Sequence, residues 1–490
     1  MDRNNLELVL VLLLSFLGLI GSAMVGVFIA YSLLLSLFFF SVALINRGIG
    51  LLSLFRMAWS GIQRSLPVIY ILLLIGAMTA IWMAAGTVPA LVYYGTSLIS
   101  PRFFVLWAFV LTGALSVLTG TAFGSVGTLG LALMAMARSA GGDTELMHPV
   151  AGAIMAGAFL GDRCSPMSSS AHLVASMTQT SLYNNLRNMM VSSRWPLAIA
   201  LVFYAALSLR YPIPLDSNAI ASALPDFFDL SGTALLPAIL ILLLATFRVN
   251  VKVAMAASIG LAAAIAHMLQ GYSLWQLVCF SCFGFQLPSE LVATEPLQSV
   301  FQGGGLVPMV KATVLVVIST AFAGIFAGSQ VLDFAERWLR NIRTQQQRSR
   351  ATVVVALFAN AFGCSQTIAI LLTQQIMQPY YSKESSGYLD IATDCATEAT
   401  EKEQLALAIE DTAVVMAPLV PWNIAFLVPT AVLSVGPGVI PYALYLLLLP
   451  LFMAIRKRSL LYNASTHQAN YSIKHRAAGK SAQTEVAPME

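Results

Sequence analysis

Charged residues are scarce in this sequence. They make up 10% of the 490 residues, whereas hydrophobic residues make up 58%. Soluble domains carry about 25% charged residues, so this chain has too few of them to cover a soluble surface of its size. The mean hydropathy of +0.79 is typical of a membrane protein. The formal net charge is only +4, and the sequence therefore gives no indication of a nucleic-acid partner.

Cysteine is also scarce, with five in the chain. Cys279 and Cys282 form a C-x-x-C, but it lies in the apolar run LVCFSCFGF, and no second cysteine or histidine pair matches it. We interpret these residues as buried thiols and expect neither a disulfide framework nor a cofactor. The motifs H-E-x-x-H and G-x-S-x-G are missing as well, which argues against the common metalloprotease and serine-hydrolase sites.

Long apolar runs dominate the sequence. The first runs from residue 6 to 45 and is much longer than the core of a cleavable signal, so we expect a hairpin of two spans that bends near residues 21–26. Further apolar windows predict an all-α polytopic membrane protein with about 11–13 spans. These windows are 67–85, 103–118, 123–137, 149–160, 195–209, 233–247, 253–269, 306–328, 351–362, 368–377, 414–435 and 442–455, with a partial span at 274–285.

Basic residues gather at some of the joints between these windows. The positive-inside rule places these joints in the cytoplasm, and the segment 210–231, rich in proline and aspartate, on the outer side. The residues are Arg47, Arg56, Arg64, Arg187, Arg194, Arg248, Lys252, Arg337, Arg340, Arg343, Arg348, Arg350, Arg456, Lys457 and Arg458.

Two apolar windows, 149–160 and 351–362, are too short to cross a bilayer and run into small and polar residues. Interrupted segments at matching places in two halves indicate a transporter site. The first half contains T-A-F-G-S from Thr121, and the second contains N-A-F-G-C-S from Asn360. Each half then has a break with an acid and a proline. We therefore predict two inverted repeats with broken or re-entrant helices.

This interpretation divides the chain into five parts. They are an N-terminal transmembrane hairpin at 1–46, a first transporter repeat at 47–230, connecting spans and a loop at 231–305, a second transporter repeat at 306–455, and a disordered cytoplasmic tail at 456–490.

The breaks are rich in oxygen ligands, which small hard cations prefer. A buried acid costs about 2.5–3.5 kcal/mol at the centre of a membrane helix, so three of them at that depth point to function. Other interpretations remain open: Asp162 pairs with Arg163 at a membrane edge, or Glu410 and Asp411 lie in a solvated loop. The candidate ligands are Thr121, Ser125, Asp162, Ser165 and Ser168 in the first half, and Asn360, Ser365, Gln366, Thr367, Glu410, Asp411, Thr412 and Asn423 in the second.

Three segments, LTGTAFGSVGTLGLALM, HPVAGAIMAGAFLGDRCSPMSSSAHL and LALAIEDTAVVMAPLVPWN, resemble signatures of the NhaC family of sodium/proton antiporters. The wider superfamily also includes exchangers of organic acids. The resemblance extends from about Arg47 to the last span. It implies inverted repeats, broken helices and alternating access. It carries over as site residues Gly120, Thr121, Gly124, Gly127, Asp162, Ser165, Pro166, Ser168, Glu410, Asp411, Pro421, Trp422 and Asn423.

The sequence departs from the family pattern G-D-K-x-S-P-L-S-D-T-T-N-L at two ligand positions. Ser169 stands where the family has an acid, and His172 where it has an asparagine. The expected cation shell thus lacks one carboxylate and one amide. Imidazole titrates near pH 6.5, so His172 is either a packing residue bonded to a carbonyl or a proton carrier that acts as a pH gate.

The leading prediction is a Na⁺/H⁺ or K⁺/H⁺ antiporter in the bacterial inner membrane, in which cation and proton compete for Asp162 and Asp411. The alternative in the same fold is a coupled exchanger or symporter of a small organic acid, with the anion held by half-helix N-termini and Arg163. A passive channel, and an intramembrane serine hydrolase built on Ser365 with His267 or His172, are less consistent with paired breaks. No metal beyond the transported cation is expected, and the oligomeric state stays open, a homodimer included.

Overall fold

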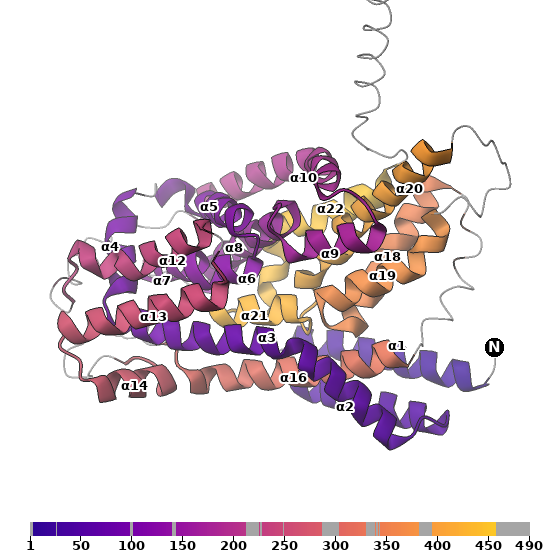
Figure 1. Ribbon diagram of the computed structural model, residues 1–490, viewed down its shortest axis with the longest axis horizontal. Coiled ribbons are helices and arrows are strands. Elements are labelled where there is room, and N and C mark those ends of the chain that lie inside the picture. The colour runs from indigo at the N-terminus through magenta and orange to yellow at the C-terminus, as the bar shows by residue number, and fades with distance from the viewer. Residues whose placement is uncertain are drawn as a thin grey trace, which may run out of the picture.

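The computed structural model describes residues 3–25, 27–98, 101–139, 144–211, 225, 228–247, 249–286, 303–329, 339, 342, 344–381 and 394–456. Apart from one isolated bridge between Phe285 and Gly303, the regular structure of these residues is helical. The helices form an elongated bundle (Figure 1). Residues 337, 338, 340, 341 and 343 of the predicted arginine loop lie outside the described residues, and its second part, 345–350, is helical and not a loop. Most of the segment 210–231 and all of the predicted tail beyond Arg456 also lie outside the described residues.

The α-helices coincide with the apolar windows in whole or in part, except at 87–98, 169–178 and 394–409, where no window was predicted. They are α1 (Arg3–Val25), α2 (Ile29–Asn46), α3 (Leu51–Ala84), α4 (Thr87–Leu98), α5 (Phe104–Thr119), α6 (Ala122–Ser125), α7 (Leu131–Ser139), α8 (Thr144–Cys164), α9 (Ser169–Thr178), α10 (Leu182–Arg210), α12 (Leu236–Thr246), α13 (Val251–Met268), α14 (Leu274–Phe283), α16 (Leu306–Gly328), α18 (Gln345–Gly363), α19 (Gln366–Tyr381), α20 (Asp394–Ile409), α21 (Ile424–Leu433) and α22 (Leu444–Ile455).

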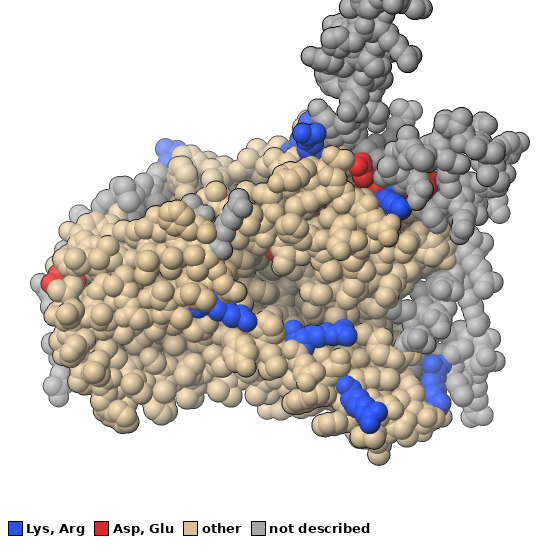
Figure 2. All heavy atoms as spheres, viewed as in Figure 1, with Lys and Arg blue, Asp and Glu red and all other residues tan. Residues whose placement is uncertain are grey.

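Five of the described helices are long and apolar enough to cross a membrane, or six if one bent pair is a single span. They are α2, α3, α10, α13 and α16, and the bent pair joins Glu401–Leu419 to Ile424–Leu433 at 47°. Leucine, phenylalanine and tyrosine side chains of α2 stay exposed, as expected where the solvent is lipid. Figure 2 shows a face with sparse charged side chains. The chain is therefore a multi-pass membrane protein with several apolar spans.

The structure has two helices in the segment predicted as the N-terminal hairpin: α1 ends at Val25 and α2 begins at Ile29. It packs on the bundle through aromatic contacts, since Phe40 of α2 lies 5.5 Å from Phe322 and 6.1 Å from Phe326 of α16, between ring centroids.

Two helices break where the sequence places an acid and a proline. The α8 helix ends at Cys164, and α9 begins at Ser169 with the Ser168 side chain as its N-cap. The α20 helix continues as a π-helical turn, Glu410–Val414, and a 3₁₀ turn, Ala417–Leu419, and α21 begins after the Asn423 cap. The prediction of broken helices is thus confirmed.

Two further breaks turn on residues with left-handed backbone. Gly120 (φ 67°) follows α5, and Cys364 (φ 46°) follows α18. A Cβ on Gly120 would lie 2.5 Å from the Met167 carbonyl carbon, so only glycine fits there. These breaks do not align through the shared A-F-G. Ala122 begins the helix after its break, whereas Ala361 lies in the helix before its break. The A-F-G match therefore does not mark equivalent positions.

Glycines allow α5 and α8 to pack backbone to backbone. A Cβ on Gly157 would lie 2.9 Å from the Gly113 nitrogen and closer still to the Phe109 carbonyl oxygen. Small residues at such a crossing let van der Waals packing hold membrane helices together.

We expect Gly157→Ala to lower the free energy of unfolding by about 1–3 kcal/mol, because an added methyl group must push two backbones apart. Gly260→Ala is the matched control: Gly260 lies inside α13 with nothing within 4 Å of an added Cβ, and the gain in helix propensity is about 0.5–1 kcal/mol. Thermal unfolding of the purified protein in one detergent measures both. Equal melting temperatures for the two variants would contradict the close packing of α5 on α8.

Candidate functional site

The first half contributes a crossing of two broken segments. The Ser165 hydroxyl, in the break after α8, donates to the Val117 carbonyl at the end of α5 (2.7 Å). Gly120 packs against Met167 in the same break. On the far side of the Gly120 turn, Thr121 caps α6 by accepting from the Gly124 amide (3.2 Å).

The second half contributes a similar crossing. The Trp422 indole nitrogen donates to the Ala361 carbonyl (2.6 Å), and the Ile424 amide donates to the Cys364 carbonyl (3.0 Å). The Asn423 amide nitrogen donates to both the backbone carbonyl and the side-chain oxygen of Asn360 (3.2 and 3.3 Å). These hydrogen bonds therefore hold the break between the 3₁₀ turn Ala417–Leu419 and α21 against the turn between α18 and α19.

Asp162 stands at the first crossing with oxygen and amide groups around it. The Ser168 hydroxyl donates to Oδ1 (3.3 Å), and the Ser170 hydroxyl donates to Oδ2 (3.3 Å). Gln366, the first residue of α19, donates from Nε2 to Asp162 Oδ2 (3.1 Å) and to the Val414 carbonyl (3.2 Å). Gln366 thus joins the crossing of the first half to the π-helical turn of the second.

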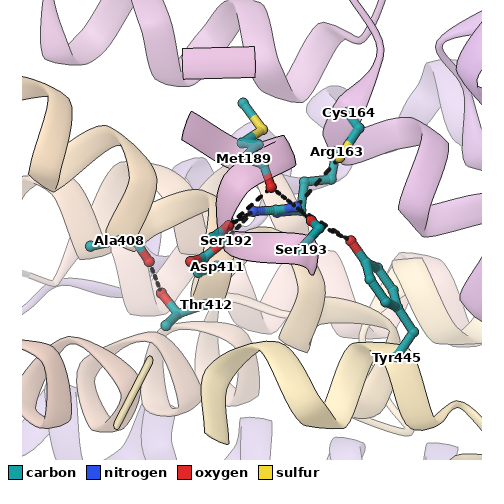
Figure 3. Close-up of polar contacts among 9 residues, drawn as sticks. All are labelled: Arg163, Cys164, Met189, Ser192, Ser193, Ala408, Asp411, Thr412 and Tyr445. Carbon is teal, nitrogen blue, oxygen red and sulfur yellow. Dashed lines mark hydrogen bonds and ion pairs between the residues drawn. The ribbon is translucent and has the colours of Figure 1, made fainter. Parts of the chain in front are cut away.

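The neighbouring Arg163 forms an ion pair with Asp411, across 248 positions of sequence. Both side chains are buried, with 0% and 4% of their surface exposed. The guanidinium also donates to the hydroxyls of Ser192 (2.7 Å) and Ser193 (2.6 Å) on α10 and of Tyr445 (3.3 Å) on α22. Figure 3 shows Arg163 between the two serines, with Asp411 on one side and Tyr445 on the other. The pair links three helices at the site.

Glu410 lies beside this pair without a partner of its own. It is 0% exposed, and neither of its carboxylate oxygens has a hydrogen-bond partner among the described residues. An isolated charge buried in a low-dielectric interior is very costly. A proton or a nearby cation is therefore needed to neutralise the carboxylate of Glu410 in this conformation.

A small cavity reaches Asp411 from the end of the bundle where α22 stops. Its volume is about 30 Å³, and its lining includes Ser349, Tyr381, Gln404 and Arg456. That space is enough for about one water molecule. Asp411 thus lines a small cavity at this end of the bundle.

The remaining predicted ligands fall into two groups. The Ser125 hydroxyl donates to the Thr121 carbonyl (2.9 Å), and the Ala369 amide donates to the Ser365 carbonyl (2.9 Å). These residues shape the turns of the crossings. His172 is exposed on α9, and its Nε2 lies 3.0 Å from the Pro166 carbonyl oxygen. This geometry favours the packing role over the role in pH gating.

Sequence reasoning missed four contributors to the site: Ser170, Ser192, Ser193 and Tyr445. The serine pair on α10 left no signal, because it precedes Arg194 and lies outside the apolar window 195–209. Tyr445 left none, because tyrosine is common near membrane helix ends.

The family model described as "Na+/H+ antiporter family" matches residues 6–173 and 157–455 of this chain. Three relatives illustrate the range of similar proteins. The "Malate-2H(+)/Na(+)-lactate antiporter" of Bacillus subtilis is 30% identical over 66% of this chain and 69% of its own length. The "Na(+)/H(+) antiporter NhaC" of Alkalihalophilus pseudofirmus is 27% identical over 81% and 82%. The "Arginine/ornithine antiporter ArcD" of Halobacterium salinarum is 25% identical over 81% and 79%.

Proposed function

Because the chain belongs to the Na⁺/H⁺ antiporter family, a family of secondary transporters and not of enzymes, we propose that it exchanges a monovalent cation, Na⁺ or K⁺, for protons. The exchange proceeds by alternating access at the two crossings. The inner membrane of a bacterium is the proposed location, with the arginine-rich joints in the cytoplasm.

The observation that supports this proposal most strongly is a difference in charge pairing. Arg163 is paired with Asp411, whereas the partners of Asp162 are neutral. The buried guanidinium of Arg163 is already neutralised by Asp411 and bonded to Ser192 and Ser193. Asp162 has only hydroxyl and amide partners. A small hard cation takes such oxygen ligands, and the carboxylate supplies the balancing charge. An anionic substrate at Asp162 would have to compete with Asp411 for Arg163.

The two helix starts nearest the site also favour a cation. Half-helix N-termini attract anions through their unsatisfied amides. Here the Ser168 side chain accepts from two amides of α9, and the Asn423 side chain accepts from one amide of α21. These caps occupy amides that an anion would otherwise use.

Proton transport is assigned to Glu410. Its buried and unpartnered carboxylate requires a neutralising proton whenever no cation is near. Glu410 directly precedes Asp411 and lies two positions before Thr412. The loss of its proton therefore changes the electrostatic field at the ion pair of Arg163 with Asp411. A cation at Asp162 and a proton at Glu410 compete because both relieve the same excess of negative charge.

Inverted repeats give these parts a means of alternating access. Two observations support them: the order of elements is the same in both halves, and each half pairs a left-handed turn with a helix break capped two residues after a proline, at Ser168 and at Asn423. Rocking of one crossing relative to the other then exposes the site to each side in turn.

Reconstitution tests the function directly. The internal pH of liposomes that contain a pH dye is expected to change on addition of Na⁺ or K⁺, in the direction set by the cation gradient. The same liposomes are expected to show saturable counterflow of labelled cation. No pH response to Na⁺, K⁺ or Li⁺ at any gradient would overturn the proposal of cation/proton exchange.

We expect Glu410→Gln to keep cation counterflow but to lose its coupling to protons. The amide has the same shape and cannot take up or release the proton. Measurement of ²²Na⁺ counterflow and of dye response in the same liposomes separates the two effects. His172→Asn is the matched control, and we expect it to keep the parent pH profile because its ring bonds to the Pro166 carbonyl. A wild-type pH response in Glu410→Gln would remove Glu410 from the proton path.

A second function, exchange of a small organic acid coupled to Na⁺ or protons, is favoured by one observation. The relative that shares 30% identity is named a malate and lactate antiporter. In this case Arg163 must leave Asp411 to bind the substrate carboxylate. Counterflow of labelled malate or lactate in the same liposomes, without a response to cation alone, would select this function.

A further inference from the structure

A second cavity lies between α3, α16 and α19. Its volume is about 450 Å³, within the range of small-molecule sites. Arg56 and Arg64 of α3 line one side, and Ile368, Leu371 and Leu372 of α19 line another. The cavity therefore combines two cationic groups with an apolar wall.

The two arginines have exposed side chains, and within the described part of the chain neither forms an ion pair with an acid. They are eight residues apart on one helix, about 12 Å along its axis. Each guanidinium presents a planar set of donors that matches a phosphate group. The chemistry of this edge of the cavity is that of an oxyanion site.

The length of α3 places this edge at the level of lipid headgroups. The helix has 34 residues, about 51 Å, whereas the hydrocarbon core is about 30 Å thick. Its uncharged part from Pro67 to Ala84 covers about 27 Å, so Arg56 and Arg64 stand beyond it. The positive-inside rule assigns this end to the cytoplasm. In Figure 2 several basic side chains lie around the end of the bundle where Figure 1 places α2 and the start of α3.

We propose that this cavity binds an anionic phospholipid of the cytoplasmic leaflet. Its phosphate lies between Arg56 and Arg64, and an acyl chain lies along Ile368, Leu371 and Leu372. Basic cavities between membrane helices on this side attract anionic headgroups. The lipid then contacts α3 and α16 on one side and, on the other, α19, whose first residue Gln366 bonds to Asp162.

The test uses the purified full-length protein and native mass spectrometry with equimolar phosphatidylglycerol and phosphatidylcholine. We expect the wild type to retain phosphatidylglycerol preferentially. Each of Arg56→Gln and Arg64→Gln is expected to weaken its retention about fivefold, the equivalent of about 1 kcal/mol per basic residue at an anionic surface. The control is Arg194→Gln, an exposed arginine of α10 outside the cavity, which should leave the retention unchanged.

Three results would overturn the proposal. The first is equal retention of the two lipids by the wild type. The second is an equal loss in the Arg194→Gln control, which indicates general surface attraction. The third is displacement of the lipid by millimolar inorganic phosphate alone, which indicates a site for a free oxyanion. If the glutamine variants do not express, the double variant Arg56→Lys with Arg64→Lys keeps the charge and replaces them. The competition between phosphatidylglycerol and phosphatidylcholine for the wild type still tests the proposal.

Discussion

Asp162→Asn is expected to abolish cation-driven proton movement, with at least a 100-fold loss of apparent cation affinity. The amide keeps the size of the side chain and one oxygen that can accept from Ser168 or Gln366, but it removes the charge that balances the bound cation. Removal of one partner of a buried charge pair costs about 3–5 kcal/mol, which corresponds to about two to three orders of magnitude in affinity. The measurement is the concentration of Na⁺ or K⁺ that gives half the maximal dye response.

The control for this prediction is Asp229→Asn. Asp229 accepts a hydrogen bond from the Ser231 amide in an exposed position, so the variant removes an acid without touching either crossing. We expect its cation dependence to equal that of the wild type, at equal amounts of folded protein by size-exclusion chromatography. Wild-type cation affinity in Asp162→Asn would remove this carboxylate from the cation site.

Arg163→Met is expected to have the largest effect on stability, a loss of about 3–5 kcal/mol in the free energy of unfolding, because it leaves Asp411 buried and unpaired. The flexible apolar chain of methionine fills most of the space, so the charge and not the volume dominates the loss. Thermal unfolding in detergent measures the change.

A double-mutant cycle identifies the cause of that loss. Asp411→Asn alone leaves the guanidinium buried, and we expect it to destabilise the protein as well. The double variant removes both charges, so we expect it to be more stable than either single variant, with a coupling energy of at least about 1 kcal/mol. If the two single losses simply add, the ion pair does not hold α8 and the π-helical turn together.

The apolar windows predicted most helices because the bilayer fixes their length and composition. The N-terminal hairpin and the break after Asp162 follow from the same rule. The window 414–435 was predicted as one span, but the structure breaks it between the 3₁₀ turn Ala417–Leu419 and α21. The predicted window began at Pro67, whereas α3 begins at Leu51. The window therefore missed the amphipathic first part of this helix. There the helix leaves the hydrocarbon region, and hydropathy no longer reports it.

The pairing within the site was not predictable in the same way. Arg163 was considered as a partner of the adjacent Asp162, but adjacent helical residues do not face each other, and Arg163 instead reaches Asp411. The shared A-F-G suggested an alignment of the halves that the left-handed residues Gly120 and Cys364 contradict. Contacts over more than 200 positions depend on how the helices pack, which one sequence does not contain.

The ion pair of Arg163 with Asp411 also sets the electrical charge of the site. The four ionised groups carry +1 from Arg163 and −1 each from Asp411, Asp162 and Glu410, a sum of −2. Because the two compete, either a cation on Asp162 or a proton on Glu410 brings this sum to −1. Moving one charge through the membrane potential involves about 2.3 kcal/mol per 100 mV. Each loaded site therefore moves one negative charge through the field, whereas the empty site moves two and is pulled more strongly toward the outer face. The membrane voltage itself thus opposes a leak in which the empty carrier returns to the cytoplasm.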